Sequence, residues 1–391
     1  MMAGLIAGVV LGFAVRLSDK PWSYRQIMYI GFPGELFQRM MSGISMPLIT
    51  SSVVAALGSS KPLVLRRVGL CALLLSLVCK CLAVAGALGL SAFLSPGSIV
   101  HSDAMVSNAT SDIRLSALAT DRLVDLIRNL YPSNIMRAHM ETTFLLDESY
   151  RSANVEKQSA GHRMGSYTLR ITNQLGLLSF SVILGLVLSA SRQEQSVVLN
   201  VFVSLSNTLV TATHMLMWFA PVGLCSITMA LVLRARDLQI LAGDLSLYII
   251  TFLAATILHG LVVLPGLYLA ITRGKLGSFF RNMIQPISMA LGLASSSQTV
   301  PALIVALEEG LQMDPRMARF LGPVGSTVNM DGTTIYLTIT LIFFAQKDAM
   351  SLGVLQYITI GLTCGLASLT TAPSGVAIDA AVHYISMSFN I

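Results

Sequence analysis

Six long apolar segments constrain the fold of this chain more than any other feature. A helix that crosses a bilayer needs about 20 mostly apolar residues, and the bilayer core leaves backbone N–H and C=O groups no partner except each other. Only 11% of the residues are charged, whereas soluble domains carry about 25%. The sequence therefore predicts an all-α polytopic membrane protein. The six segments are Leu36–Leu57, Arg67–Leu94, Leu175–Ser191, Val197–Leu233, Leu245–Thr272 and Met317–Ala345.

Two further apolar stretches, Phe279–Leu307 and Ser351–Ile391, are interrupted by small and polar residues. The first contains the serine run Ser295–Ser297, and its two arms are too short to cross a bilayer singly. We therefore predict a re-entrant helical hairpin, in which serine hydroxyls and free backbone N–H groups at the tip bind a carboxylate. The alternative is that the serines donate to carbonyls of their own helix. A second small-residue break over Gly361–Gly375 predicts a second hairpin.

Between these stretches, an aspartate lies in the motif Asn329–Thr333. A carboxylate at membrane depth costs about 2.5–3.5 kcal/mol on the lenient insertion scale, so Asp331 faces a partner, an ion or water rather than lipid. Gly325 and Gly332 allow local unwinding that exposes carbonyl oxygens, and such hard oxygens suit a small hard cation such as sodium. The alternative is that Asp331 pairs with a buried Lys or Arg.

A polar insert separates the second and third apolar segments. Residues 101–174 are rich in Ser, Asn and Thr, and Asn108 begins a glycosylation sequon. Clusters of Lys and Arg in other loops place those loops in the cytoplasm and this insert outside. Within the insert, Leu118–Leu130 has apolar residues at helical spacing, which fits an interfacial helix and a solvated amphipathic helix equally well.

Several function classes are disfavoured. The net charge of +6 does not indicate nucleic-acid binding, because the basic residues cluster in loops between apolar segments. All five cysteines lie in apolar segments, and we interpret them as reduced small hydrophobes. The sequence pairs no nucleophile with a base and has no cluster with metal-ligand spacing, so we expect neither an enzyme nor a cofactor.

Five motifs resemble the glutamate/neutral amino acid cation symporter family, the sodium:dicarboxylate symporters that include the animal excitatory amino acid transporters. Arg319–Gly325 leading into Asn329–Thr333 is similar to the seventh helix, which is the most specific signature of the family. Ser295–Pro301 resembles the tip of the first hairpin, and Phe32–Met40 and Trp218–Gly223 resemble parts of the second and fifth helices. The similarity extends over nearly the whole chain.

The resemblance implies a glutamate-transporter-like fold with two re-entrant hairpins. It also implies a homotrimer, in which each subunit combines a scaffold with a mobile, elevator-type transport domain. The implied activity is sodium-coupled symport of an amino acid or dicarboxylate by a multi-pass glycoprotein of the plasma membrane. The chain then divides into the first three membrane helices (1–100), the extracellular insert (101–174), further scaffold and transport helices (175–272) and the transport core (273–391).

The resemblance also assigns binding roles to residues at matching positions. Three consecutive serines would bind the substrate carboxylate, and a threonine would contact the far end of the substrate. Oxygens of the seventh-helix motif would form three sodium sites, and a methionine would couple sodium to substrate. These residues are Ser295, Ser296, Ser297 and Thr333 for the substrate, and Gly325, Thr327, Asn329, Met330 and Asp331 for sodium.

The sequence also departs from the family pattern. In the family an eighth helix with further ligands follows the second hairpin, so we expect this chain, which ends at Ile391, to lack the last transmembrane helix. Leu337 follows Tyr336 where proton-coupled members carry a glutamate, which argues against proton coupling. An alternative function is therefore a transport-incompetent subunit that assembles with full-length relatives. The sequence leaves the identity of the amino acid open.

A further departure lies in the apolar segment Arg67–Leu94. The family places a tyrosine and hydroxyl residues there as partners of a sodium site, whereas this chain has Ser76, Cys79 and Lys80. We predict that the Lys80 ammonium takes the place of a cation and forms an ion pair with Asp331, because pairing removes two costly lone charges. The alternative is that Lys80 snorkels to the membrane interface.

Overall fold

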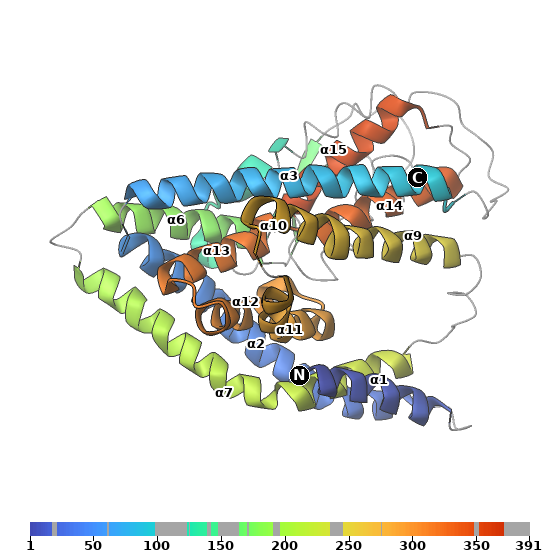
Figure 1. Cartoon of the computed structure of the whole chain (residues 1–391), viewed down its shortest axis with the longest axis horizontal. Helices are drawn as coiled ribbons and strands as arrows, with labels where there is room; N and C mark the ends of the chain where they lie inside the picture. Colours follow the sequence, from blue (N-terminus) through green and yellow to red (C-terminus); the bar gives the residue numbers. More distant parts are fainter. Residues whose placement is uncertain are drawn as a thin grey trace.

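The structure, a computed structural model, consists of long helices and one small β-hairpin (Figure 1). Five described stretches are long and apolar enough to cross a membrane, and they coincide with five of the six predicted segments: Tyr24–Gly58, Arg67–Leu94, Val197–Arg234, Ser246–Thr272 and Pro315–Lys347. The sixth segment corresponds to the shorter helix α6 (Gln174–Ala190). The structure describes residues 1–17, 22–60, 62–97, 123–124, 126–138, 142–147, 164–169, 172–190, 196–234, 245–274, 276–347 and 352–370.

The helices pack in two groups with a hairpin layer between them. One group consists of α1 (Met2–Arg16), α2 (Tyr24–Gly58), α6 and α7 (Ser196–Arg234), and the other of α3 (Pro62–Leu94), α9 (Ser246–Ile257), α14 (Asp331–Lys347) and α15 (Val354–Thr370). In Figure 1, α3 and α7 lie on opposite sides of the molecule. Between them lie α11 (Leu276–Leu293), α12 (Ser296–Val305) and α13 (Pro315–Val328), which form the hairpin layer. Two segments are π-helical: η2 (Leu258–Val263) precedes α10 (Leu264–Thr272), and η3 (Ala306–Gly310) follows α12 in the hairpin layer.

Helix α2 begins earlier than the apolar pattern indicated. The Ser23 side chain accepts a hydrogen bond from the Gln26 N–H, and the Gln26 side chain accepts one from the Ser23 N–H. This capping box fixes the start of the helix at Tyr24 rather than at Leu36. Pro33 lies inside the helix, and the Ser226 hydroxyl of α7 accepts from the Gly34 N–H next to it. A membrane helix tolerates proline when a neighbour satisfies the freed backbone groups in this way.

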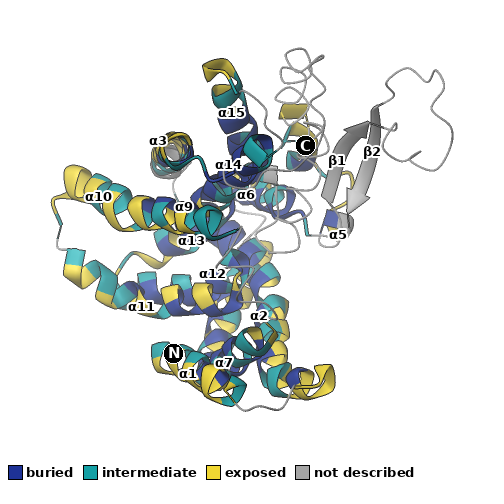
Figure 2. Ribbon diagram, turned by 90° about the vertical axis from the view of Figure 1, so that its right-hand side faces the viewer, coloured by how far each residue is buried: buried dark blue, intermediate teal, exposed yellow. Residues whose placement is uncertain are grey.

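The burial of the helices separates a core from an outer face (Figure 2). In the most apolar windows of Pro315–Lys347 and Tyr24–Gly58, 67% and 61% of the residues are buried, whereas Arg67–Leu94 and Ser246–Thr272 each have 17% buried. The outer helix α3 exposes a row of leucines that includes Leu70, Leu73 and Leu77. An apolar outer face of this size suits contact with lipid rather than with water.

Two predicted interruptions are breaks between helices. Ala294 and Ser295 separate α11 from α12, which pack against each other. Asn329 and Met330 separate α13 from α14, so the predicted segment Met317–Ala345 is two helices rather than one. The second predicted break, Gly361–Gly375, is continuous helix as far as Thr370 at the end of α15, and its residues from 371 onward lie outside the described residues.

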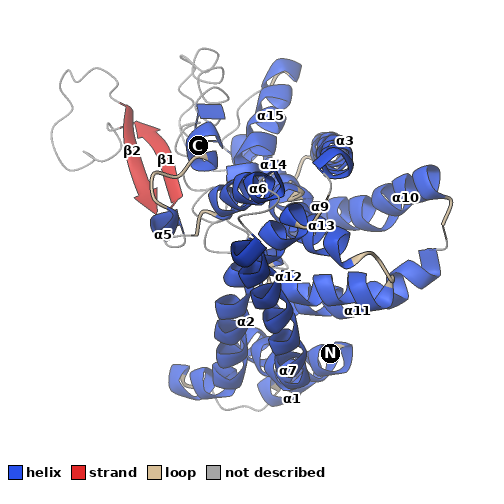
Figure 3. Cartoon of the chain, turned by 90° about the vertical axis from the view of Figure 1, so that its left-hand side faces the viewer, coloured by secondary structure: helices blue, strands red, loops and turns tan. Residues whose placement is uncertain are grey.

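The structure contains one element that the sequence did not indicate. In the polar insert, β1 (Thr142–Asp147) and β2 (Met164–Leu169) form an antiparallel pair, with Thr142 opposite Leu169 (Figure 3). Residues 126–130, in the second half of the stretch with helical spacing, are helical and precede α5 (Ile135–Ala138). The sequon residue Asn108 lies outside the described residues. The fold is otherwise all-α in the part of the chain that the structure describes.

Candidate functional site

Asp331 is the first residue of α14, and its side chain is 7% exposed. The Oδ2 atom lies 3.0 Å from Nε2 of His259, whereas Oδ1 is buried without a hydrogen-bond partner. The dipole of α14 favours a carboxylate in its first turn. His259 belongs to the π-helical segment η2, and such segments are frequent at functional sites. The carboxylate is therefore held inside the protein with one oxygen engaged and one available.

His259 is missing from the predicted site, although the sequence contains a signal for it. It is the one acidic or basic side chain in the apolar segment Leu245–Thr272. An ionisable residue inside a membrane segment is a functional candidate by default. The same reasoning that drew attention to Lys80 therefore applied to His259.

The predicted ion pair between Lys80 and Asp331 is contradicted by the structure. Lys80 Nζ lies 2.7 Å from Ser368 Oγ and 3.4 Å from Thr334 Oγ1, and Asp331 contacts His259 instead. Thr334, which follows Asp331 by three residues on α14, offers its hydroxyl to the ammonium, and His259 already takes the carboxylate. Lys80 is 7% exposed, so the alternative of snorkelling to an interface does not describe it either.

Three buried oxygens at the helix break have no hydrogen-bond partner: Thr327 Oγ1, Asn329 Oδ1 and Asp331 Oδ1. Leaving a buried polar group unsatisfied costs about 1–3 kcal/mol, and native structures satisfy most such groups. A methyl group added at Gly325 or Gly332 would meet no atom within 4 Å, so both glycines border open space. Oxygen donors beside open space are the arrangement that a hard cation such as sodium requires.

The serine tip lies beside this break. Ala294 is in the left-handed region (φ 48°) and Ser295 is extended, and these two residues reverse the chain between α11 and α12. Ser296 Oγ donates to the carbonyl oxygen of Ser326 at 3.4 Å, and Ser295 Oγ lies 3.2 Å from Ser297 Oγ. All three serines are described, and the hydrogen bonds found for them do not run to carbonyls of their own helix. Their hydroxyls and the N-terminus of α12 together form an arrangement suited to an anion.

Two other predicted residues complete the same region. Met330 is buried at the break, and Thr333 is half-buried on the first turn of α14. The structure therefore brings the nine predicted substrate and sodium residues into one region formed by the start of α12, the end of α13 and the start of α14. It also adds three polar residues that the sequence analysis did not select, namely His259, Thr334 and Ser368.

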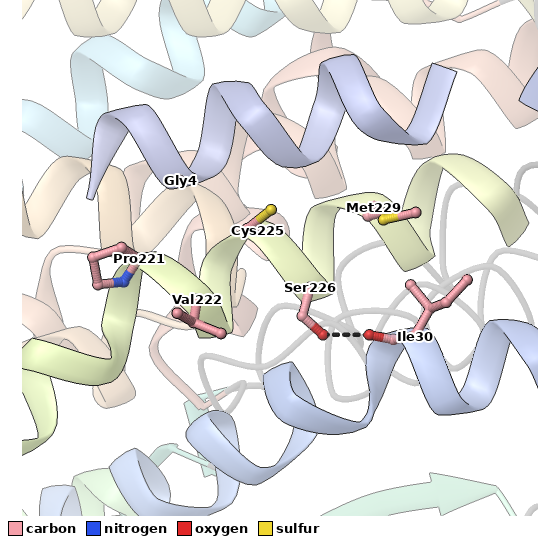
Figure 4. A pocket seen from close by; sticks show the side chains of 7 residues that line it. All are labelled: Gly4, Ile30, Pro221, Val222, Cys225, Ser226 and Met229. Atoms are coloured by element: carbon pink, nitrogen blue, oxygen red, sulfur yellow. Dashed lines mark hydrogen bonds between the residues drawn. The ribbon is translucent and has the colours of Figure 1, made fainter. Parts of the chain in front are cut away.

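A separate cavity of about 420 Å³ lies between α1, α2 and α7 (Figure 4). Its one hydroxyl, that of Ser226, donates to the carbonyl oxygen of Ile30. The lining offers no charged group to a carboxylate or a cation, so the cavity does not suit the substrate predicted above. The residues that line it are Gly4, Ile30, Pro221, Val222, Cys225, Ser226 and Met229.

The sequence matches known proteins over nearly its whole length. Residues 1–389 match the sodium:dicarboxylate symporter family. The chain is similar to excitatory amino acid transporter 1 of Homo sapiens, with 31% identity over 398 residues that cover 95% of this chain and 71% of the relative. It is also similar to neutral amino acid transporter B(0) of Oryctolagus cuniculus, with 30% identity over 398 residues that cover 100% of this chain and 72% of the relative. Excitatory amino acid transporter 4 of Mus musculus is 31% identical over 411 residues, which cover 95% of this chain and 72% of that protein.

Proposed function

Because this chain belongs to the sodium:dicarboxylate symporter family, we propose that it carries an amino acid or a dicarboxylate across the plasma membrane together with sodium. The chain is a multi-pass membrane protein and a transporter rather than an enzyme. The relatives are named for excitatory and for neutral amino acids, which supports both an acidic and a neutral amino acid as candidate substrates.

The observation that carries this proposal is the contact between the serine tip and the broken helix. Ser296 donates to the carbonyl oxygen of Ser326, so an anion held at the tip would lie beside the oxygens of the break. The hydroxyls of Ser295, Ser296 and Ser297 bind the substrate carboxylate, and Thr333 contacts its far end. Substrate and cation then occupy neighbouring positions, and each lowers the electrostatic cost of binding the other.

The sodium sites use the oxygens that lack partners. Backbone oxygens of Gly325 and Asn329 serve one ion, and the Asn329 side chain with Asp331 serves another. Thr327 and Met330 help to form a third, in which Met330 couples sodium to the substrate. The unsatisfied Thr327, Asn329 and Asp331 oxygens support this assignment, because a bound cation would remove their desolvation cost.

The elevator mechanism assigns the two helix groups to different bodies. The group of α1, α2, α6 and α7 is the scaffold, and the group of α3, α9, α14 and α15 moves together with the hairpin layer. The packing within each group supports the division, whereas the hairpin layer packs mainly against α2 and α7, so the proposed motion has to separate these contacts. Assembly as a homotrimer and glycosylation at Asn108 complete the proposal.

Uptake into liposomes tests the proposed function directly. The purified chain is reconstituted, and the entry of labelled aspartate, glutamate and serine is measured with an inward gradient of sodium or of choline. We expect uptake of one of these compounds that requires sodium. Asp331→Asn should reduce the uptake at least tenfold, because it removes a charged cation ligand. Thr256→Ala, which changes an exposed threonine of α9 that bonds only within its own helix, is the matched control.

Two results would count against this function. Equal uptake in sodium and choline would remove the sodium coupling, and no uptake of any labelled compound would favour the second candidate, a non-transporting subunit that assembles with relatives. The buried Lys80 ammonium is the observation that favours this candidate, because it fixes a positive charge close to the oxygens that a cation needs. Purification of a tagged relative, expressed with and without this chain, would then detect the assembly.

A further inference from the structure

Lys80 brings a second buried basic side chain into the region of Asp331. Its Nζ is bound by hydroxyls from two other helices, Ser368 on α15 at 2.7 Å and Thr334 on α14 at 3.4 Å. Lys80 is 7% exposed, and both hydroxyl residues are 0% exposed. The ammonium therefore connects α3 to two neighbouring helices in the interior of the protein.

The two hydroxyls are oriented by further hydrogen bonds. Ser368 Oγ donates to the carbonyl oxygen of Gly365 at 2.8 Å, and Thr334 Oγ1 lies 3.1 Å from the carbonyl oxygen of Met330 and 2.9 Å from Ser368 Oγ. Because each hydroxyl has a single proton and uses it on these acceptors, its lone pairs are free to face the ammonium. The Lys80 ammonium thus faces the lone pairs of two buried hydroxyl oxygens, which are ligands that a bound cation also uses.

The charge of this region limits how many cations it can hold. A buried ammonium without a counter-charge is costly, and the carboxylate of Asp331 lies in the same first turn of α14 as Thr334, whose hydroxyl contacts Lys80 Nζ. The attraction between the two charges acts across space, since His259 holds the carboxylate oxygen Oδ2. One carboxylate balances one full positive charge, so the Lys80 ammonium uses electrostatic compensation that a sodium ion would otherwise receive.

We propose that Lys80 is a tethered cation that takes the place of one coupling sodium ion. With Lys80 present, the site binds one sodium ion fewer than it would without this side chain. The ammonium also keeps α15 attached to α3 and α14 when sodium is absent. This inference rests on the proposed sodium-coupled function, because it concerns the number of ions that the same site binds.

Sodium binding and thermal stability of the purified chain test the proposal without any transport measurement. The wild type, Lys80→Met and Lys80→Arg are compared by equilibrium dialysis with radioactive sodium and by thermal unfolding in sodium or choline chloride. Lys80→Met keeps an unbranched side chain that is one atom shorter and removes its charge. We expect this variant to lose stability in choline, to recover it in sodium, and to bind one additional sodium ion per chain. Lys80→Arg keeps the charge and should bind as many ions as the wild type.

The outcomes separate the inference from the proposed function. Lys80→Met with the same number of bound ions as the wild type would overturn the inference, as would a Lys80→Met chain that fails to fold at every sodium concentration. If the wild type binds no sodium but Lys80→Met does, the sodium-coupled function fails and the inference stands. If neither binds sodium, both fail. Ser368→Ala keeps the charge and serves as the control, in which the number of bound ions should not change.

Discussion

At the scale of single residues, the contact between Asp331 and His259 determines which oxygens at the break between α13 and α14 have a hydrogen-bond partner. The histidine satisfies one carboxylate oxygen, while the other and two neighbouring oxygens remain without partners. A buried acceptor that loses its donor pays the full cost of desolvation. The stability of the chain without sodium therefore depends on His259.

The variant His259→Leu tests this dependence. It leaves both oxygens of Asp331 without a donor, and we expect a loss of about 1–3 kcal/mol of stability in choline chloride. Sodium should restore part of the loss, because a cation can satisfy the carboxylate in place of the histidine. Thermal unfolding in detergent measures both effects, and His259→Gln, which keeps an N–H donor, should lose less. An equal loss in sodium and in choline would show that the carboxylate does not bind the ion.

A second prediction at this scale concerns pH. Asp314 caps α13, and hydrogen bonds from Arg316 hold the pKa of its carboxyl below the usual value of 3.8. A carboxyl with a lowered pKa in the folded state stabilises the protein above its unfolded pKa, and this contribution is lost as the pH falls through the folded value. Asp314→Asn keeps the capping oxygen and removes the charge. We expect a slightly lower unfolding temperature at neutral pH and a difference that disappears in acid, measured against the wild type over a pH series.

The sequence predicted some residues of the candidate site but not their contacts, for a physical reason. Asp331 and the serine tip were found because a charge or a serine run inside an apolar segment is conspicuous by composition alone. The partner of Asp331 was predicted wrongly, because choosing between Lys80 and His259 requires the rotation and spacing of three helices that composition does not contain. The hydroxyls of Thr334 and Ser368 escaped notice, since threonine and serine are common in membrane helices and usually bond to their own backbone.

At the scale of elements, apolar length predicted the positions of the helices, and local hydrogen bonds set their ends. The capping box at Ser23 starts α2 earlier than the apolar run, and Asn329 divides a single predicted segment into two helices. The β-hairpin in the insert was not predicted, because its strands lie in a polar region without clear alternation. Close helix packing was also hidden, although the glycines that permit it are visible in the sequence.

The packing of α1 on α7 gives the prediction at this scale. Gly4, Gly8 and Gly12 face α7, and a Cβ at Gly8 would lie 1.9 Å from the Oγ1 atom of Thr228 and 2.4 Å from the carbonyl oxygen of Cys225. Small residues at this spacing allow two membrane helices to approach closely. Gly8→Ala should therefore push α1 away and lower the unfolding temperature by several degrees.

A matched variant separates this packing effect from the effect of glycine itself. Gly266 is also inside a helix, and a Cβ there would meet no atom within 4 Å. Gly266→Ala should be neutral or slightly stabilising, because alanine is the better helix former. If both variants behaved alike in thermal unfolding, the close approach of α1 to α7 would be refuted.

At the scale of the whole molecule, polar contacts connect the group of α2 and α7 to the hairpin layer. Arg319 donates to Asn207 at 2.5 Å and also pairs with Glu308 at 2.6 Å. Gln298 donates to Ser42 at 2.7 Å, and His214 lies 3.3 Å from Glu309. These polar contacts lie beside an apolar cluster that α2 and α7 share with α11 and α12, and which includes Phe37, Leu224, Met289 and Val300. A motion of the hairpin layer against α2 and α7 therefore has to break the polar contacts and rearrange this apolar packing.

An elevator motion requires these contacts to break, and a covalent link across them should prevent it. We expect that Ser42→Cys with Gln298→Cys, joined by a short linker that forms a disulfide bond with each thiol, abolishes sodium-driven uptake and that reduction of these disulfides restores it. The exposed or partly exposed Cys71, Cys81 and Cys225 are first replaced by serine.

The control pair lies within one group, where no relative motion is expected. A Cβ at Gly31 would lie 3.1 Å from the Cβ of Ala230, so Gly31→Cys with Ala230→Cys links α2 to α7. This pair, treated with the same linker, should keep its uptake, because both helices belong to the proposed scaffold. Full uptake by the linked Ser42–Gln298 pair would mean that α12 does not move against α2 during transport. Loss of uptake in both pairs would instead indicate that the linker inactivates the protein irrespective of where it binds. Pairs of cysteines between other helices would then be needed to test the motion.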